Sequence, residues 1–319
     1  MKIWLIVAAC LVAAGAIVFC VAMTLNQWDF RKLETVVRVT NEATVTEPFE
    51  NIRIDTDTAD IRILPSEDGS VKVVCAEEDS SDRHTVSVTD GTLTVSLTED
   101  KKWYHHIHLF SWESPSVTVY LPEGEYASLA VKASTAEVKV SDDFTFESVN
   151  IRLSTGDASL ASSVKGLVEI KTSTGAILCE GLSAGRMNLS ATTGTITLSE
   201  VNCPGAIELS VDTGKNRLEN VTCLGLTSEG RTGDITLVGV VASGKIEIER
   251  STGDVIFEGC DAREIDVDTD TGHVKGSFLS DKIFYTKTDT GKVTVPHSTK
   301  GDICEVETDT GNINLWICE

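Results

Sequence analysis

The sequence predicts an all-β protein, a parallel β-solenoid with coils of 19–20 residues that follows one transmembrane helix. Three observations support this fold class. A Thr-Gly pair recurs nine times at a nearly fixed period, apolar residues alternate on both sides of each pair, and the chain begins with a long run without charged residues. A short fixed period is typical of solenoid proteins.

The amino-terminal segment is expected to anchor the chain in a membrane. Residues 3–25 are 23 positions without a charged side chain, and a helix of that length spans a hydrocarbon core of ~30 Å. We therefore predict a signal-anchor transmembrane helix over residues 1–25. Cleavage as a signal peptide is the alternative, but the one small-x-small site, Ala14 to Ala16, is followed by more apolar chain.

The orientation of this anchor depends on weaker signals. Arg31 and Lys32 follow the helix and reduce the positive-inside difference between its two ends. Nearly all of the mass lies after the helix, in sequence that is rich in Ser, Thr and Gly and low in Lys. These features favour a single-pass protein of the cell membrane with an extracytoplasmic carboxyl-terminal domain.

Residues 26–45 are interpreted as a juxtamembrane linker, and residues 46–121 as a first coil with a hairpin cap region. The stretch NIRIDTDTADIRI, around Ala59, fits the repeat, but the period lapses from about Leu64 to Tyr120. Two alternating runs in this segment are joined through Asp90-Gly91, a strong hairpin signal. Because the ends of a solenoid need caps, the hairpin is expected to cover the first coils.

Residues 122–319 are predicted to form the solenoid repeats. Apolar residues stand five and seven residues before most of the recurring glycines, and the alternation resumes two and four residues after them. Each coil thus contains short strands with one buried face. A third apolar column, which includes Cys260 and Leu279, follows seven residues after the glycines. Such coils supply each other with partners by stacking ~4.8 Å apart with parallel hydrogen bonds.

The Thr-Gly pairs mark a corner that recurs in every coil. Glycine at a corner adopts backbone angles that a Cβ would oppose, and the preceding Thr stacks on the Thr of the next coil. We therefore expect a structural role, and no catalytic role, for the nine glycines Gly156, Gly175, Gly194, Gly214, Gly233, Gly253, Gly272, Gly291 and Gly311.

These motifs resemble the putative adhesin family of bacterial membrane-anchored β-strand-repeat proteins, a domain of unknown function. The resemblance is carried by the series STGDA, STGAI, TTGTI, RTGDI, STGDV and TDTGKV and by the run VTVYLPEGEYASLAV that precedes it. It covers roughly residues 46–319. It implies a surface β-solenoid with a role in adhesion or envelope stress, and the family pattern contains no catalytic residues to transfer.

The charge and the regular coils limit the classes of function. The 27 basic and 49 acidic side chains give a formal charge of −22, which argues against nucleic-acid binding and against broad docking on anionic lipid. Coils of 19–20 residues leave no long loops to build a catalytic cleft. The histidines His84, His273 and His297 are scattered, without a Ser-His-Asp order or a glycine-rich phosphate loop. We therefore predict that the protein is not an enzyme.

The carboxyl-terminal coils carry an acidic face. Asp270, Asp289 and Asp309 are expected to stack directly at ~4.8 Å, which is unfavourable without compensation. Calcium is one compensation, and Lys287 with solvent is the other. The lack of an EF-hand or nonapeptide calcium loop favours the solvated face, and no other cofactor is expected. The outward carboxylates are Glu247, Glu249, Asp266, Asp268, Asp270, Asp289, Glu305, Glu307 and Asp309.

The segment KKWYHHIHLFSW, residues 101–112, gathers aromatic and histidine side chains in the cap region. Two histidines that share a strand face, without nearby carboxylates, are a weak metal signal. A loop that packs on the first coils is one interpretation, and a loop at the membrane interface is the other. The candidate interface residues are Trp103, Tyr104, His106, His108 and Trp112.

Nine cysteines, two of them in the anchor, leave an odd number outside it. No pair has the CxxC spacing that is typical of zinc sites. Cys203 and Cys223 each fall nine residues after a glycine, so their Cα atoms are expected ~4.8 Å apart in adjacent coils, within disulfide range. Parallel Cβ directions would strain the bridge, so a disulfide and two free thiols both remain open.

Two functions are compatible with these features. The first is a membrane-anchored, non-enzymatic surface solenoid whose flank binds an envelope polymer or a surface protein. The second is a structural or regulatory module of an envelope-stress system. In that case an unpaired β-edge at Asn312 to Trp316 joins the chain to another copy or to a signalling partner.

Overall fold

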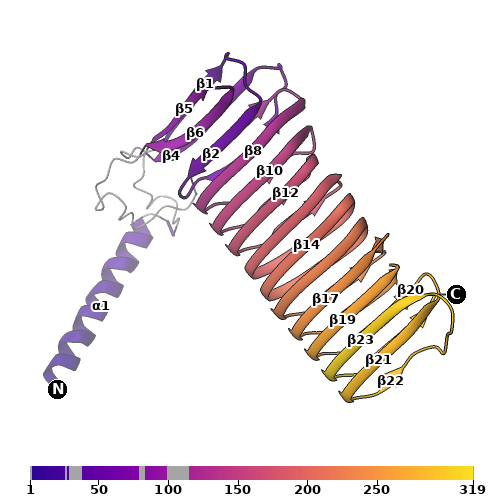
Figure 1. Cartoon of the computed structure of the whole chain (residues 1–319). Coiled ribbons are helices and arrows are strands. Elements are labelled where there is room, and N and C mark those ends of the chain that lie inside the picture. The colour runs from indigo at the N-terminus through magenta and orange to yellow at the C-terminus, as the bar shows by residue number, and fades with distance from the viewer. Residues whose placement is uncertain (1, 26, 29–37, 79–82, 99–114, 319) are drawn as a thin grey trace.

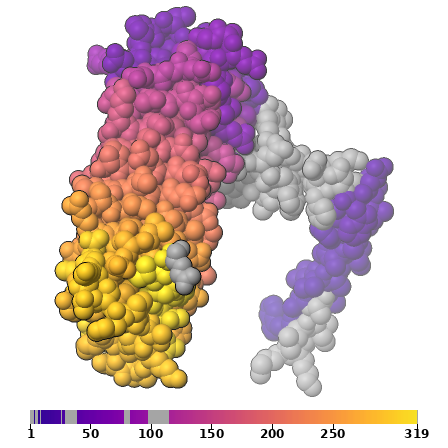
Figure 2. Space-filling model, turned by 90° about the vertical axis from the view of Figure 1, so that its right-hand side faces the viewer, coloured from indigo at the N-terminus to yellow at the C-terminus, as the bar shows by residue number. Residues whose placement is uncertain are grey.

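The computed structural model describes residues 2–25, 27–28, 38–78, 83–98 and 115–318. They form helix α1 (Lys2–Leu25) and an elongated β-solenoid whose strands follow one another along a single stack (Figure 1). In the space-filling view the colour runs along the stack from indigo to yellow, so its two ends come from opposite parts of the sequence (Figure 2). The predicted parallel β-solenoid is confirmed by the register of its strands.

Helix α1 is 24 residues long and contains the segment predicted to be an anchor. Most of its described apolar side chains, among them Trp4, Leu11 and Leu25, are exposed, whereas Met23 is buried. Within the residues that the structure describes, no helix meets the length and apolarity required of a membrane span.

The middle of the solenoid consists of coils in parallel register. Ile151 pairs with Val131 of the coil before it and with Ile170 of the coil after it. The shorter strands that follow the corners stack in the same way. The strands of this region are β8 (Gly124–Thr135), β9 (Val138–Val140), β10 (Phe144–Thr155), β11 (Ala158–Leu160), β12 (Ser163–Thr174), β13 (Ile177–Glu180), β14 (Ala184–Thr232), β15 (Ile235–Val238), β16 (Val241–Ala242), β17 (Lys245–Thr252), β18 (Val255–Cys260), β19 (Glu264–Thr271) and β20 (Val274–Phe278).

The inward columns form one continuous hydrophobic core. Val168, Met187 and Ile207, each seven residues before a glycine, have no exposed surface, and the same cluster of buried residues extends from the first coil to the last. The alternation of apolar residues therefore predicts the core face correctly.

One position of the third column differs from its prediction. Cys260 pairs with Phe278 after a register shift between the two coils. Phe278 is consequently buried, whereas Leu279 is 54% exposed. The expectation that Leu279 belongs to this column is wrong, because the shift moves the chain by one residue.

The nine corner glycines stack too closely to allow a side chain. A Cβ on Gly214 would lie 1.6 Å from the carbonyl oxygen of Gly194. Six of the nine have φ between +124° and +157°, but no such φ occurs at Gly272, Gly291 and Gly311. At these three, a Cβ would still lie 1.8–1.9 Å from a stacked carbonyl oxygen. Close stacking thus favours glycine at all nine of these corners, whereas the backbone angle adds a second reason at only six.

At the amino-terminal end, the spatial order differs from the sequence order. β2 (Asn51–Thr56) lies between β8 and β6 (Thr92–Thr98), and β3 (Asp60–Pro65) lies between β9 and β7 (Ser116–Leu121), all in parallel. Beyond this parallel coil, β5 (Arg83–Thr89) pairs antiparallel with β6, and β4 (Val71–Glu78) pairs antiparallel with β7. The first coil in the sequence is therefore enclosed on both sides.

The predicted hairpin is confirmed, but part of the predicted linker belongs to the cap. Asp90 and Gly91 have φ of +48° and +69°, the left-handed values of a tight hairpin turn. β1 (Arg38–Val45) pairs antiparallel with β4 along its whole length. The interpretation of residues 38–45 as linker is wrong, because these residues satisfy the backbone groups on the outer side of β4.

The carboxyl-terminal end is interleaved in the same way. β23 (Asp302–Thr310) lies between β19 and β21 (Lys282–Thr290), and β24 (Ile313–Ile317) lies between β20 and β22 (Val293–Thr294) (Figure 1). The unpaired edge predicted at Asn312 to Trp316 is wrong for Ile313 and Asn314, which pair with β20 on one side and with β22 on the other, whereas Leu315 and Trp316 pair with β20 alone. The edge of the stack is formed by β21 and β22.

A buried lysine holds the start of this outermost coil. The side chain of Lys282 is fully buried, with its Nζ 2.5 Å from Asp261 Oδ1 and 2.7 Å from the carbonyl oxygen of Ala262. The same Nζ lies 3.5 Å from Asp302 Oδ2 of the inserted coil. Because these oxygens come from two other coils, one cation ties the interleaved segments together.

Candidate functional site

The acidic flank is the outward face formed by the nine carboxylates of the carboxyl-terminal coils named above. The interleaved strand order places Asp309 between Asp270 and Asp289 instead of after them. Burial raises the pKa of Asp268 above its ordinary value, and neighbouring carboxylates, Glu307 foremost, act in the same direction. The carboxylates of the flank therefore repel one another.

Two lysines offset part of this charge. Lys245 Nζ lies 2.8 Å from a carboxylate oxygen of Asp266 and 2.8 Å from one of Glu247, and these contacts raise the pKa of the lysine. Lys287 pairs with Glu307. Exposed pairs of this kind contribute only ~0–1 kcal/mol each. Calcium binding by Asp270, Asp289 and Asp309 stays a prediction.

An open groove of about 360 Å³ lies beside the stacked aspartates. Five carboxylates and two arginines line it, and Glu249, Asp268 and Asp270 belong both to the groove and to the acidic flank. One arginine, Arg231, is paired with Asp212 at 3.2 Å. The complete lining is Ser210, Asp212, Glu229, Gly230, Arg231, Glu249, Arg250, Ser251, Asp268 and Asp270.

The second arginine of the groove, Arg250, is almost fully buried. It is 5% exposed, donates to Ser228 Oγ at 2.8 Å, and has no partner for Nε. Burial lowers its pKa to about 10. Departures from the repeat make room for it: Asn216 and Ser228 stand in apolar columns, and a Cβ on Gly230 would lie 2.1 Å from Arg250. The groove thus lies where polar residues replace the apolar residues of the repeat.

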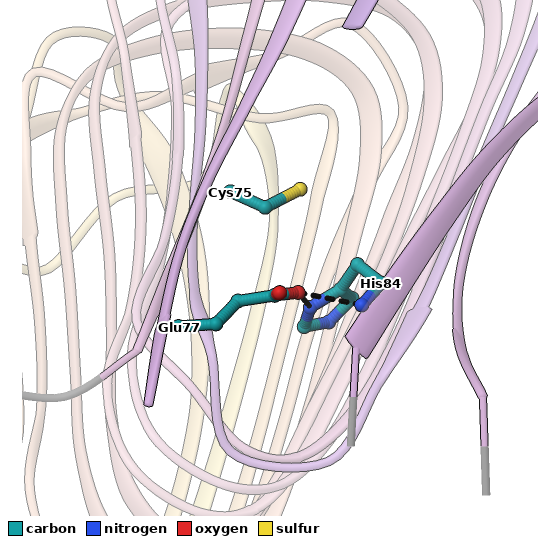
Figure 3. A group of neighbouring side chains, drawn as sticks. All are labelled: Cys75, Glu77 and His84. Carbon is teal, nitrogen blue, oxygen red and sulfur yellow. Dashed lines mark hydrogen bonds and ion pairs between the residues drawn. The ribbon is translucent and has the colours of Figure 1, made fainter. Parts of the chain in front are cut away.

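A different group of side chains lies inside the amino-terminal cap. Cys75 and Glu77 stand two residues apart on β4 and point to the same side of the strand, and His84 at the start of β5 faces them (Figure 3). A sulfur, a carboxylate oxygen and a ring nitrogen of the three lie within 4.8 Å of one another. Within the described part of the chain, no other group of three His, Cys, Asp or Glu side chains meets this criterion.

Hydrogen bonds fix two members of this group. The carboxylate of Glu77 accepts from the backbone N of His84 at 2.5 Å, from His84 Nδ1 at 2.6 Å and from Asn41 Nδ2 at 2.9 Å. The other ring nitrogen of His84, Nε2, lies 2.8 Å from Thr56 Oγ1. Burial raises the pKa of Cys75 to about 12, with the Glu77 charge acting in the same direction. The free thiol is therefore protonated and a poor nucleophile at neutral pH.

Sequence patterns do not predict this group. CxxC spacing is absent, and His84 is isolated from the other histidines in the sequence. The Cys-x-Glu spacing on an alternating strand is a usable local signal, because it places both side chains on one face. The approach of His84, however, depends on the contact between β4 and β5, which no local pattern encodes.

The predicted cysteine pair occupies the expected column. Cys203 and Cys223 are both buried free thiols, and Cys223 pairs with Ala242 of the next coil. Burial raises the pKa of Cys223 to about 12, and the neighbouring Cys203 acts in the same direction. The disulfide between them stays a prediction. The predicted interface residues Trp103, Tyr104, His106, His108 and Trp112 lie outside the described residues.

Comparison with known proteins gives one family and several distant structures. The model of the Toastrack DUF4097 family matches residues 49–210, and no curated protein matches the chain. Among solved structures, the chain is similar to a putative adhesin from Bacteroides fragilis at 16% identity, over 88% of this chain and 97% of that one, with a TM-score of 0.41. A putative adhesin from Parabacteroides distasonis is similar at 15% identity, over 75% and 98% of the two chains, with a TM-score of 0.44. A putative lipid binding protein from the same species is similar at 12% identity, over 87% and 96%, with a TM-score of 0.37.

Proposed function

This chain belongs to the Toastrack DUF4097 family, and we propose that it is a non-enzymatic, membrane-anchored surface protein whose solenoid flank binds an envelope polymer or another surface protein. The observation that carries this proposal is the groove beside the acidic flank. Its five carboxylates are strong hydrogen-bond acceptors, and they project from rigid, stacked strands. A ligand rich in hydroxyl or ammonium groups matches this surface.

The anchor is supported by the charge-free run of residues 3–25 and by the exposed apolar side chains of α1. Apolar side chains that find no protein core are stabilised by a lipid core. In the orientation favoured by the sequence, such an anchor would leave the solenoid on the outer side of the cell membrane, where a groove on its flank is accessible to envelope components.

The experiment compares two variants of the purified full-length protein in detergent. The groove variant carries Asp212→Asn, Glu229→Gln and Asp270→Asn. The control variant carries Glu123→Gln, Asp142→Asn and Glu180→Gln, which remove the same number of exposed carboxylates outside the groove. Co-sedimentation with isolated cell envelopes measures binding. We expect the groove variant to lose at least ~10-fold in affinity and the control to bind like the wild type, a difference of ~1.4 kcal/mol or more.

Equal binding by both variants, or no binding by the folded wild type, would contradict the proposal. Salt provides an internal check, because binding through exposed carboxylates and ammonium groups weakens as ionic strength rises. Binding that is unchanged by salt would point to a ligand held by hydroxyl groups.

The open edge favours a second candidate, a structural or regulatory module that joins end to end with another chain. β21 and β22 form this edge, and Tyr285 and Val293 there are 58% and 42% exposed. An unpaired edge of this kind is a template for another strand. Light scattering of the full-length protein tests the idea against Val293→Lys, with Leu224→Lys as a control because Leu224 is an exposed residue away from the edge. A monomer for all three proteins excludes self-association.

A further inference from the structure

We propose that Cys75, Glu77 and His84 form a zinc site that fastens the amino-terminal cap. The three side chains supply one sulfur, one oxygen and one nitrogen ligand within 4.8 Å of one another. In a tetrahedral zinc site, with bonds of ~2.0–2.3 Å, ligand atoms lie roughly 3–4 Å apart. The observed separations are thus near those that an ion requires, and side-chain rotation is sufficient to reach them.

The strands bring the ligands together without distortion. Cys75 and Glu77 alternate on one face of β4, and His84 comes from β5, so two separate strands contribute to the group (Figure 3). All three side chains are nearly removed from solvent: Cys75 is 2% exposed, and the side chains of Glu77 and His84 are 4% and 3% exposed. A buried site of this kind has no room for a polymer or peptide substrate, so its role is structural.

Outer hydrogen bonds support the same interpretation. With Nδ1 of His84 on the metal, Nε2–H donates to Thr56 Oγ1, which already lies 2.8 Å away. The second carboxylate oxygen of Glu77 accepts from Asn41 Nδ2 at 2.9 Å. The first oxygen accepts from the backbone N and from Nδ1 of His84, and loss of the Nδ1 proton leaves one of its lone pairs for the ion. A metal-bound histidine usually donates its other N–H, and a metal-bound carboxylate is usually hydrogen-bonded in turn. Both supports are present here, on β1 and β2.

The ligand types select the ion. A thiolate and an imidazole favour zinc over calcium or magnesium, which prefer oxygen ligands throughout. One thiolate and one carboxylate neutralise the charge of Zn²⁺, so the bound group adds no net charge to the apolar cap. On binding, Zn²⁺ replaces the thiol proton of Cys75, and the proton of His84 Nδ1 is exchanged for one on Nε2.

An ion pair between Glu77 and His84 is the simpler explanation of the same contacts. It accounts for the 2.6 Å distance between the carboxylate and Nδ1 and for the contact between Nε2 and Thr56, because a protonated histidine donates from both ring nitrogens. It assigns no role to the thiol of Cys75 beside them. A bound metal ion involves five groups: Cys75, Glu77 and His84 as ligands, with Thr56 and Asn41 as their hydrogen-bond partners. The two explanations therefore make different predictions for metal binding.

The test uses full-length protein in detergent, freed of metal by a chelator and then titrated with Zn²⁺ or Co²⁺. We expect one equivalent to bind, a thiolate-to-cobalt charge-transfer band in the near ultraviolet, and a higher Tm with Zn²⁺. Cys75→Ala removes the band and the rise in Tm. Cys179→Ala is the matched control, because Cys179 is a fully buried thiol within an apolar core, and it leaves both unchanged. Thr56→Val is expected to weaken zinc binding by ~10–100-fold.

X-ray absorption at the zinc edge of the wild type keeps the test independent of how well the variants fold. The proposal expects one sulfur and lighter nitrogen or oxygen neighbours around the ion. It is overturned if the wild type shows no cobalt–thiolate band, if the zinc has no sulfur ligand or more than one, or if folded Cys75→Ala keeps the band. In those outcomes the group is a buried ion pair beside a thiol.

Discussion

The two ends of the solenoid share one topological feature but differ in the strands that lie beyond it. At each end one coil is inserted out of sequence order, that of β2 and β3 at one end and that of β23 and β24 at the other. Beyond its inserted coil, the amino-terminal end continues into the antiparallel strands β1, β4 and β5. Among the described strands, β21 and β22 at the other end pair on one side only.

Burial of side chains follows this difference. Val117 and Val119 belong to the outermost parallel coil of the amino-terminal end, yet both are fully buried, because β4 covers their strand. In the outermost coil at the other end, the inward-facing Phe284 is only half-buried and Val293 is 42% exposed. Interleaving thus protects the carboxyl-terminal segment, but it does not close the stack. At the amino-terminal end, antiparallel strands cover the parallel coil. Although β1 and β5 themselves pair on one side only, they no longer offer the register of the next parallel coil.

The largest effect is expected from glycine substitutions at an inner and an outer corner. A Cβ at Gly214 would lie 1.6 Å from a carbonyl oxygen inside the stack, so Gly214→Ala is expected to destabilise the fold by about 4 kcal/mol or more. Gly291→Ala meets a carbonyl oxygen at 1.9 Å, but its coil is outermost and free to shift away. Urea denaturation measures both. Equal losses of stability would mean that the outer coil is held as tightly as the inner ones.

Phenylalanine truncations sharpen the same comparison. Phe146 is fully buried near the amino-terminal end and packs against Tyr126 and Phe144, so Phe146→Ala is expected to cost about 3–5 kcal/mol. Phe284 in the outermost coil is only half-buried, and Phe284→Ala is expected to cost about 1–2 kcal/mol. The free energies of unfolding, measured with the same denaturant, decide the comparison. A larger loss at Phe284 would show that this end is covered in solution.

A pair of carboxylates should respond to pH in opposite directions. Lys171 lowers the pKa of Glu169, so its charged form stabilises the fold above the unfolded pKa of about 4.3, and this contribution is lost as pH falls. The pKa of Asp268 is raised, so its contribution is present at low pH and is lost as pH rises through the raised value.

At pH 7, Glu169→Gln is therefore expected to lower the Tm and Asp268→Asn to raise it, by a few degrees at most. At pH 3 both differences are expected to be smaller, because the wild-type carboxyl groups bind more protons there than at pH 7. Melting curves of the two variants and the wild type at the two pH values test this. Shifts of the same sign at pH 7 would contradict the contrast between the paired and the crowded carboxylates.

The smallest effect is expected from calcium. If the acidic flank is only solvated, we expect the same Tm in ~1 mM calcium and in chelator. We then expect a higher Tm in both conditions when Asp270, Asp289 and Asp309 are replaced by Asn. A calcium-dependent rise in Tm that these substitutions abolish would show instead that the three stacked aspartates bind the ion.

The repeat predicts the interior of the solenoid well because each coil meets its neighbours in the same way. Apolar alternation places residues such as Met187 and Ile207 in the core, and Asp90-Gly91 marks the hairpin. The repeat does not predict the order of the coils at the two ends, because a coil inserted between two others has the same sequence pattern as a coil added at the end. The sequence of Asn312 to Trp316 therefore predicts an edge, although Ile313 and Asn314 are paired on both sides. Likewise, Cys75 and His84 meet only through the strands of the cap at the other end.

Hydrogen exchange of the full-length protein tests the interleaved order most directly. Residues 302–317 include the buried Cys304, Val306 and Ile313. β23 and the first two residues of β24 pair on both sides, whereas the strands of residues 282–294 pair on one side. We predict that amides of residues 302–317 exchange more slowly than those of residues 282–294, although they lie closer to the chain terminus. Faster exchange in residues 302–317 would mean that the coils stack in sequence order, which contradicts this account of the two ends.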